Sequence, residues 1–569
     1  MITTHRLLTP TKFALCISAA LSVNACDEAA APAPTPPAEA DAISDVFDYG
    51  PDPTTLPRLD ARALLIRFSL DLRGIRPTLA EYDELAESPD PKVALAVLRD
   101  RFLASPEFPG RVRDLWSNIL RTRVEDFPVT AAALGLAPEL EPALFASIGE
   151  EPLMLLSYLA ENDLPLTLLV TSDLTFSDPL IASVFPVDYP AGATGWQSTR
   201  YNDGRPAAGW LSMNALWWRY LSDGVSYGRG RANAVARIFL CADFLDRPVD
   251  FPRDVDLTDE AGIRDAVKTN DGCIGCHSSL DALASFLAGF QYANKTGTEM
   301  TRYHPERERN WPRLTGLAPA FYGAPGYSLS DLGQQLAADP RFVTCLTERA
   351  FELLIHPHDP TDSGELDALT SHRESLLAGG LTLRSLFRSV LDDPRYALAA
   401  QEKIVSPDVW SDVLFDLTGY RFTVSDVDVF ATDGTGLKTL AGGADGRAGS
   451  EPSTTPTVTM TLSWERSAEA AASFASRAAA GSTGHALFAE VTPDYVPSGR
   501  PHDDPAMRRQ VAFLHARLFG TRLDATAALA EIDEPLTLWE RAHQIERDPR
   551  RAWAAVLTAF LRDPSMVIY

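Results

Sequence analysis

The feature that most constrains this chain is the short run Cys273-Ile274-Gly275-Cys276-His277. Two cysteines separated by two residues lie about one turn apart when the segment is helical, and the next residue then lies beside them. This C-x-x-C-H spacing is the attachment signature of c-type haem. The thiols would bond to the two vinyl groups on one edge of the porphyrin, and the imidazole would ligate the iron. The run predicts one covalent haem c bound by Cys273, Cys276 and His277, with His277 as the proximal metal ligand.

The residues around this motif favour a helix, but they leave other uses of the cysteines open. Thr269-Asn270-Asp271-Gly272 is a turn and N-cap sequence. Helical apolar spacing follows, which could wall a haem pocket. The alternatives are a structural disulfide, a thioredoxin-like redox pair and half of a zinc site. A zinc site needs further ligands at short spacing, and the nearest, Cys241 and His304, are far along the chain.

The N-terminus predicts export. Phe13 to Val23 is an apolar run too short for a permanent membrane helix, and it follows a weakly basic start. It ends in Val23-Asn24-Ala25-Cys26, which resembles a bacterial lipoprotein signal and implies cleavage before Cys26 and lipid on its sulfur. The alternative is a plain secretory signal. Residues 27–41 are Ala, Pro and acid with one Thr, typical of an extended spacer.

Two further cysteines need a role in an oxidising compartment. Of six cysteines, Cys16 lies in the signal, and Cys241 and Cys345 lie in apolar stretches on either side of the haem motif. A disulfide between Cys241 and Cys345 is the simplest interpretation, and two buried free thiols are the alternative. Closing a loop of roughly a hundred residues would contribute up to about 4–5 kcal/mol.

Periodicity predicts a mainly α fold of several helical modules around a cytochrome c-like haem-attachment region. A weak repeat supports the modules, because residues 102–108, 390–396 and 560–566 each end an amphipathic helix with an acid or Ser, then Pro, then a bulky apolar residue. Thr457 to Leu462 alternates like a strand, so a small α+β insertion is expected near residues 420–465. Its Asp and Gly residues indicate turns rather than a calcium loop, because the EF-hand spacing is absent. The expected organisation is a signal peptide (1–25), a linker (26–57), an N-terminal helical domain (58–175), a haem-attachment domain (176–310), a helical domain (311–400), a mixed α+β region (401–500) and a C-terminal helical module (501–569).

Several segments together resemble a known family. They are Gly209 to Met213, Arg229 to Cys241 with its Arg-Gly opening and Leu-Cys end, the C-x-x-C-H motif, and Leu70 to Thr78. The chain resembles the planctomycete-type cytochrome c proteins, which are large exported bacterial proteins of several domains and unknown function. The resemblance covers residues 58–120 and 205–400, implies haem at the motif and supports Cys241 and Cys345 as structural partners. The chain departs from the family at Leu280-Asp281-Ala282, where an acid and Pro are usual, and in a Pro-rich strip reduced to Pro248 and Pro252.

The second axial ligand would set the redox properties of such a haem. Met300 and His304 follow the motif at a plausible distance, and Met213 lies inside the resembling segment. His356 and His358 could hold a metal, but an exposed loop after a helix explains them better. The chain shows no serine-hydrolase elbow, phosphate-binding loop or convincing carboxylate pair.

The charge narrows the function further. A net charge of −26 repels phosphate backbones, which argues against nucleic-acid binding. Two hypotheses follow. The first is an exported monohaem c-type cytochrome, lipid-anchored to a bacterial membrane on the periplasmic face or cell surface, that transfers electrons to a redox partner protein. The second is a non-redox surface lipoprotein with a structural disulfide, whose helical scaffold binds a protein or polymer. Both favour electron transfer or binding over hydrolysis.

Overall fold

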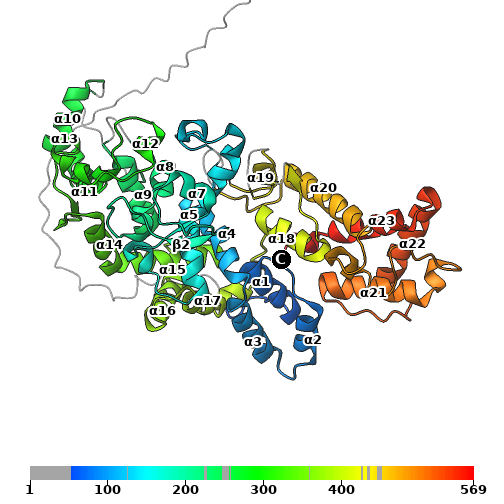
Figure 1. Cartoon of the computed structure of the whole chain (residues 1–569). Coiled ribbons are helices and arrows are strands. Elements are labelled where there is room, and N and C mark those ends of the chain that lie inside the picture. Colours follow the sequence, from blue (N-terminus) through cyan, green and yellow to red (C-terminus); the bar gives the residue numbers. More distant parts are fainter. Residues whose placement is uncertain are drawn as a thin grey trace, which may run out of the picture. The chain divides into compact units, whose positions relative to one another are not determined.

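Helices dominate the described chain in the computed structural model, as the sequence predicts (Figure 1). The structure describes residues 53–124, 126–222, 227–246, 256, 258–357, 359–424, 427–431, 436–444 and 451–569. The predicted signal, the lipidation site Cys26, Pro248, Pro252 and His358 lie outside these residues. Residues from Tyr49 to Tyr569 form one unit by their contacts.

One large hydrophobic core takes residues from Leu65 to Tyr396. The helices of this part of the chain are α1 (Ala61–Arg73), α2 (Leu79–Glu87), α3 (Pro91–Leu103), α4 (Phe108–Leu120), α5 (Glu141–Glu161), α6 (Leu168–Thr171), α7 (Pro179–Val184), α8 (Asn214–Arg219), α9 (Arg229–Leu240), α10 (Glu260–Thr269), α11 (Asp271–Ser285), α12 (Gly297–Met300), α13 (Trp311–Leu314), α14 (Leu329–Ala338), α15 (Pro340–Leu354), α16 (Ser363–Ala378) and α17 (Leu383–Leu391). Two short antiparallel ribbons join it, β1 (Thr175–Ser177) with β2 (Gln197–Thr199) and β3 (Ala320–Phe321) with β4 (Ala324–Pro325).

A second core takes residues from Val405 to Val567, together with Leu70 of α1. Its elements are α18 (Pro407–Thr418), β5 (Thr423–Val424), β6 (Val427–Asp428), α19 (Leu437–Leu440), α20 (Val458–Ala475), α21 (Pro505–Phe519), α22 (Ala530–Glu546) and α23 (Pro549–Leu561). The buried carboxylate of Asp71 ties the two cores together. It accepts hydrogen bonds from the hydroxyls of Tyr396 and Tyr569, each at 2.8 Å, and pairs with Lys403.

Local chemistry explains where many helices begin. A short polar side chain precedes the helix and accepts a hydrogen bond from an N–H group of the first turn, and a proline often follows, because its missing N–H would have had no partner there. Helices α3, α15, α18, α21 and α23 begin in this way, at Asp90, Asp339, Ser406, Asp504 and Asp548.

The strand predicted at Thr457–Leu462 is wrong, because these residues begin helix α20. The Thr457 hydroxyl accepts a hydrogen bond from the Met460 N–H at 3.2 Å and caps the helix. The buried residues that follow recur with helical rather than twofold spacing, since Met460, Trp464 and Ala468 share one face. Six alternating residues were too few to reveal this. Among the described residues of the region, the short ribbon β5–β6 supplies the strand.

The three predicted helix stops bury their bulky residues, as the repeat implies. Phe108, Tyr396 and Met566 are each at most 1% exposed. After α17 and α23, Asp393 and Asp563 cap similar 3-10 turns, Pro394–Ala397 and Pro564–Met566. Phe108 instead begins α4 directly.

The segment Pro138–Glu161 is long and apolar enough to cross a membrane by length and composition, and 67% of its most apolar window is buried inside the fold. Most of it is helix α5, which lies in the first core. Its Glu151 side chain is fully buried and accepts a hydrogen bond from the Thr175 hydroxyl at 2.7 Å. This position is that of a core helix.

Candidate functional site

Helix α11 carries the C-x-x-C-H motif in its first two turns. The Asn270 side chain caps the helix by accepting a hydrogen bond from the Gly272 N–H at 3.0 Å. Cys273 and Cys276 therefore lie one turn apart on a regular helix, as the motif requires. Both thiols are unbonded and partly exposed. The structure thus presents two thiols that a reagent can reach, followed directly by His277.

The His277 imidazole is held by a carboxylate on the next turn of the same helix. Its Nδ1 atom lies 3.1 Å from Oδ1 of Asp281. Arg229, at the start of α9, donates to both oxygens of Asp281, at 2.6 and 2.8 Å. The Asp281 side chain is 3% exposed, whereas that of His277 is 24% exposed. Among the described residues, the structure gives the Nε2 atom of His277 no partner.

The ionisation of Asp281 decides which ring nitrogen of His277 can bind a metal. Burial raises the pKa of this carboxyl, but hydrogen bonds from Arg229 and His277 and the charge of Arg229 outweigh that effect and lower it. An ionised Asp281 accepts hydrogen bonds only, so Nδ1 of His277 carries the proton and Nε2 keeps its lone pair. This pattern, a metal-binding histidine whose second nitrogen donates to a carboxylate, is common in metal sites.

The C-terminal half of α11 is buried in the first core, in contrast to its thiol-bearing end. The Ser285 hydroxyl anchors it by donating to the carbonyl oxygen of Leu317 at 2.8 Å. The buried apolar residues beyond the motif that the spacing predicts are Leu283, Ala284, Phe286, Leu287 and Phe290. The donor set fits a covalently attached haem, because two accessible thiols and an imidazole nitrogen without a partner among the described residues are what its attachment needs.

The three candidate distal ligands occupy different surroundings. Met213 and Met300 are fully buried in the first core. His304 has contacts at both ring nitrogens, with Nε2 lying 2.8 Å from the carbonyl oxygen of Glu299 and Nδ1 3.2 Å from the Glu306 carboxylate. Within the described part of the chain, no hydrogen bond or ion pair joins any of the three to His277. The choice of a distal ligand stays a prediction.

Cys241 and Cys345 form the predicted disulfide, with Cα atoms 5.2 Å apart and 104 residues between them in sequence. Cys241 follows the last turn of α9, and Cys345 lies in α15. The disulfide therefore joins the helix that holds Arg229 to the helices after the motif. It leaves Cys273 and Cys276 as the unpaired cysteines of the described chain.

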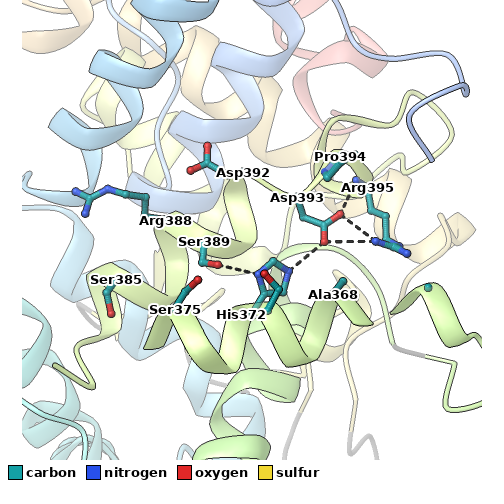
Figure 2. Close-up of a pocket in the computed structure, with 12 residues that line it drawn as sticks. Ala368, His372, Ser375, Ser385, Arg388, Ser389, Asp392, Asp393, Pro394 and Arg395 are labelled. Atoms are coloured by element: carbon teal, nitrogen blue, oxygen red, sulfur yellow. Dashed lines mark hydrogen bonds and ion pairs between the residues drawn. The ribbon is translucent and has the colours of Figure 1, made fainter. Parts of the chain in front are cut away.

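A second histidine site, which the sequence analysis does not single out, lies between α16 and the end of α17 (Figure 2). His372 on α16 is buried, with Nδ1 2.8 Å from the Ser389 hydroxyl and Nε2 3.0 Å from Oδ2 of Asp393. Asp393 also accepts the Arg395 backbone N–H at 2.8 Å. The cluster lines a pocket of about 640 Å³. No spacing rule could have found it, because folding alone brings the three residues together.

His356 is not part of a metal cluster in the described chain. Its Nε2 atom lies 3.1 Å from the Glu365 carboxylate. No group of three or more His, Cys, Asp or Glu residues that could hold a metal ion occurs among the residues that the structure describes. A pairing with Glu365 accounts for His356.

Comparison with known proteins found no matching protein family, no similar curated protein and no matching solved structure. The resemblance to the planctomycete-type cytochrome c proteins therefore stays a prediction that depends on the quoted motifs.

Proposed function

We propose that this protein is an exported, lipid-anchored c-type cytochrome that carries one haem at Cys273, Cys276 and His277 and transfers electrons. One observation carries the proposal. Helix α11 presents two unbonded thiols one turn apart, and the imidazole that follows has its Nδ1 atom held by Asp281 and its Nε2 atom without a partner among the described residues.

Each residue of this site has a distinct part in the proposal. A covalently bound haem supplies an iron centre that cycles between two oxidation states. Cys273 and Cys276 anchor it to α11, and His277 offers Nε2 to the iron. Asp281 fixes the ring orientation and makes the imidazole a stronger donor, and Arg229 holds Asp281 in place.

The proposed location follows from the N-terminal segment, and the proposed partner follows from the net charge. Lipid on Cys26 would attach the chain to a membrane, with the Pro-rich residues 27–41 as a spacer. A net charge of −26 would attract a redox partner protein with a basic surface. A variant with Cys26 replaced by Ser should remain exported but leave the membrane fraction. Persistence in the membrane would contradict the anchor.

The test of covalent haem is expression of the full chain with a cytochrome c maturation system, followed by a haem-stained denaturing gel and a pyridine haemochrome spectrum. We expect a c-type signal that survives denaturation and disappears in the double variant Cys273→Ser/Cys276→Ser. The matched control is Cys241→Ala/Cys345→Ala, which removes the other cysteine pair and should retain haem.

A different outcome would favour the second hypothesis. A folded, colourless chain whose Cys273 and Cys276 are oxidised to each other would contradict the cytochrome proposal. The motif would then be a local disulfide, and the function would lie in what the helical scaffold binds.

A further inference from the structure

We propose that the pocket between α16 and the end of α17 is a hydrolytic site, in which Ser389 attacks short-chain carboxylic esters of polar alcohols. This site is separate from the haem motif and does not depend on haem. Its core is the chain of hydrogen bonds from Ser389 to His372 to Asp393 (Figure 2).

The direction of the two hydrogen bonds follows from the state of Asp393. Burial raises the pKa of this carboxyl, but the hydrogen bonds from His372 and the Arg395 N–H, with the charge of Arg395, outweigh it and lower the pKa. Ionised Asp393 only accepts, so Nε2 of His372 carries the proton. Nδ1 then accepts from the Ser389 hydroxyl. The order of nucleophile, base and orienting carboxylate is that of a serine-hydrolase triad, with the roles of the two histidine ring nitrogens exchanged.

Ser389 differs from several other hydroxyl residues inside the described helices. Serine and threonine hydroxyls commonly donate back to the carbonyl oxygen one turn earlier. Thr347, Thr418 and Thr558 do so here, to Val343, Leu414 and Ala554. Within the described chain, the hydrogen bond that the structure gives the Ser389 hydroxyl is the one to His372. Its hydroxyl is committed to a base, which is what a nucleophile requires.

The walls of the pocket indicate the class of substrate. They are small or polar, and no aromatic or long aliphatic side chain is among them. Such walls give a long acyl chain no large apolar side chain to pack against, so a short acyl group and a polar alcohol fit best. The lining residues besides the triad are Gly364, Ala368, Ser371, Ser375, Ser385, Arg388, Asp392, Pro394 and Arg395.

The reaction needs only the ester and water. The Ser389 oxygen bonds to the carbonyl carbon while its proton passes to Nδ1 of His372. The carbon–oxygen bond to the alcohol then breaks, and the alcohol leaves with that proton. Water repeats the sequence to release the acid and restore Ser389. Asp393 stabilises the transient imidazolium and is itself paired with Arg395.

The first test is labelling of the folded full chain with a fluorophosphonate, which replaces its fluoride with an activated serine oxygen, followed by peptide mass spectrometry. We expect modification at Ser389. The matched control, Thr370→Ala, removes an exposed hydroxyl of α16 that lies outside the pocket lining and donates to the Leu366 carbonyl oxygen; labelling of Ser389 should stay within twofold. Because the site is mapped on the unaltered chain, the result does not depend on a variant folding. A folded chain left unlabelled at Ser389 would overturn the proposal.

The second test separates catalysis from a structural role. His372→Gln should slow labelling of Ser389 by at least about 100-fold, because a general base is worth roughly that much. Asp393 is a positioning residue, so Asp393→Asn should slow labelling and change its pH profile. Equal labelling rates in the unaltered chain and in folded His372→Gln would refute the triad.

Hydrolysis of p-nitrophenyl esters tests the substrate class. Acetate should be cleaved at least tenfold faster than octanoate, and Ser389→Ala should lose this activity. The measurement uses the Cys273→Ser/Cys276→Ser background, because free thiols also react with activated esters. A preference for octanoate, or equal activity in folded Ser389→Ala, would overturn the proposed substrate or the proposed nucleophile.

Discussion

The segment around α11 and the segment around α16 and α17 each combine a histidine, an aspartate and an arginine, but different pairs of them are local in sequence. At the first, the bond between His277 and Asp281 is local to one helix, and Arg229 comes from another helix. At the second, the pair between Asp393 and Arg395 is local, and His372 comes from another helix. The first histidine is therefore oriented by its own helix, whereas the second is oriented only when the helices pack together.

The two histidines also differ in what their second nitrogen meets. The His277 side chain is 24% exposed, and among described residues its Nε2 atom has no partner. The His372 side chain is 6% exposed, and its second nitrogen meets the Ser389 hydroxyl. A carboxylate-held histidine thus suits an added metal centre where its free nitrogen faces outward beside two thiols. It suits proton transfer where that nitrogen faces a hydroxyl in a pocket.

The largest expected effect comes from the disulfide that connects the two segments. Replacing Cys241 and Cys345 with Ala should lower the free energy of unfolding by up to about 4–5 kcal/mol, because the disulfide closes a long loop in the unfolded chain. Both segments should lose stability together, since α9 holds Arg229 and α15 contacts α16 and α17. Urea unfolding followed by tryptophan fluorescence measures this. The Cys273→Ser/Cys276→Ser variant is the control, and equal unfolding midpoints in all forms would contradict the prediction.

Asp281→Ala should have the next largest effect. The substitution leaves the Arg229 guanidinium and Nδ1 of His277 without their acceptor, and the free energy of unfolding should fall by about 2–3 kcal/mol. The loss is smaller than for a fully buried ion pair because the Arg229 side chain is 22% exposed. In the haem-loaded chain, the weaker imidazole donor should also raise the reduction potential. Urea unfolding and potentiometric titration measure the two effects. The control Asp271→Ala changes an exposed acid on the same helix and should cost less than about 1 kcal/mol.

The local interactions of the first segment explain why the sequence could predict it. The start of the helix, its cap at Asn270 and the order of Cys273, Cys276 and His277 all lie within eight consecutive residues, and 3.6-residue periodicity suffices to place them. The Cys241–Cys345 disulfide was also within reach, because few cysteines remained to pair. Arg229 was not, since its contact with Asp281 is tertiary.

The contacts of the second segment could not be predicted from sequence patterns. Ser389 and Asp393 lie 17 and 21 residues after His372, and no helical or strand period connects such positions. Asp393 stood out as a helix stop but not as a partner of histidine. The strand predicted at Thr457–Leu462 failed for a related reason, because the residues that decide its structure, such as Trp464 and Ala468, lie beyond it.

Asp393 contacts His372 of another helix, and its contribution to the stability of the second segment should depend on pH. The variant Asp393→Asn should remove this pH dependence. The folded-state pKa of Asp393 is lowered, so its stabilisation is present above the unfolded pKa of about 3.9 and is lost as pH falls through the folded value. The unaltered chain should therefore exceed the variant in stability by about 1–2 kcal/mol at pH 7, and less at pH 3. Urea midpoints at both values measure the difference. The control is Asp392→Asn, which changes an exposed neighbouring residue. If the stability difference between the unaltered chain and Asp393→Asn were the same at both pH values, the prediction would be contradicted.

Ser389→Ala should have the smallest effect on folding. The half-buried hydroxyl makes one hydrogen bond, and water entering the pocket can satisfy Nδ1 of His372, so the loss should stay below about 1 kcal/mol. Urea unfolding measures it beside the control Ser385→Ala, which loses a comparable bond to the Thr382 carbonyl oxygen. If Ser389 only held α17 against α16, Ser389→Ala should lower the free energy of unfolding as much as Asp393→Asn does. The loss of the Ser389 hydroxyl would then disturb the alignment of His372 and Asp393. A small loss of stability combined with a complete loss of fluorophosphonate labelling is therefore the result that a nucleophile predicts and a structural serine does not.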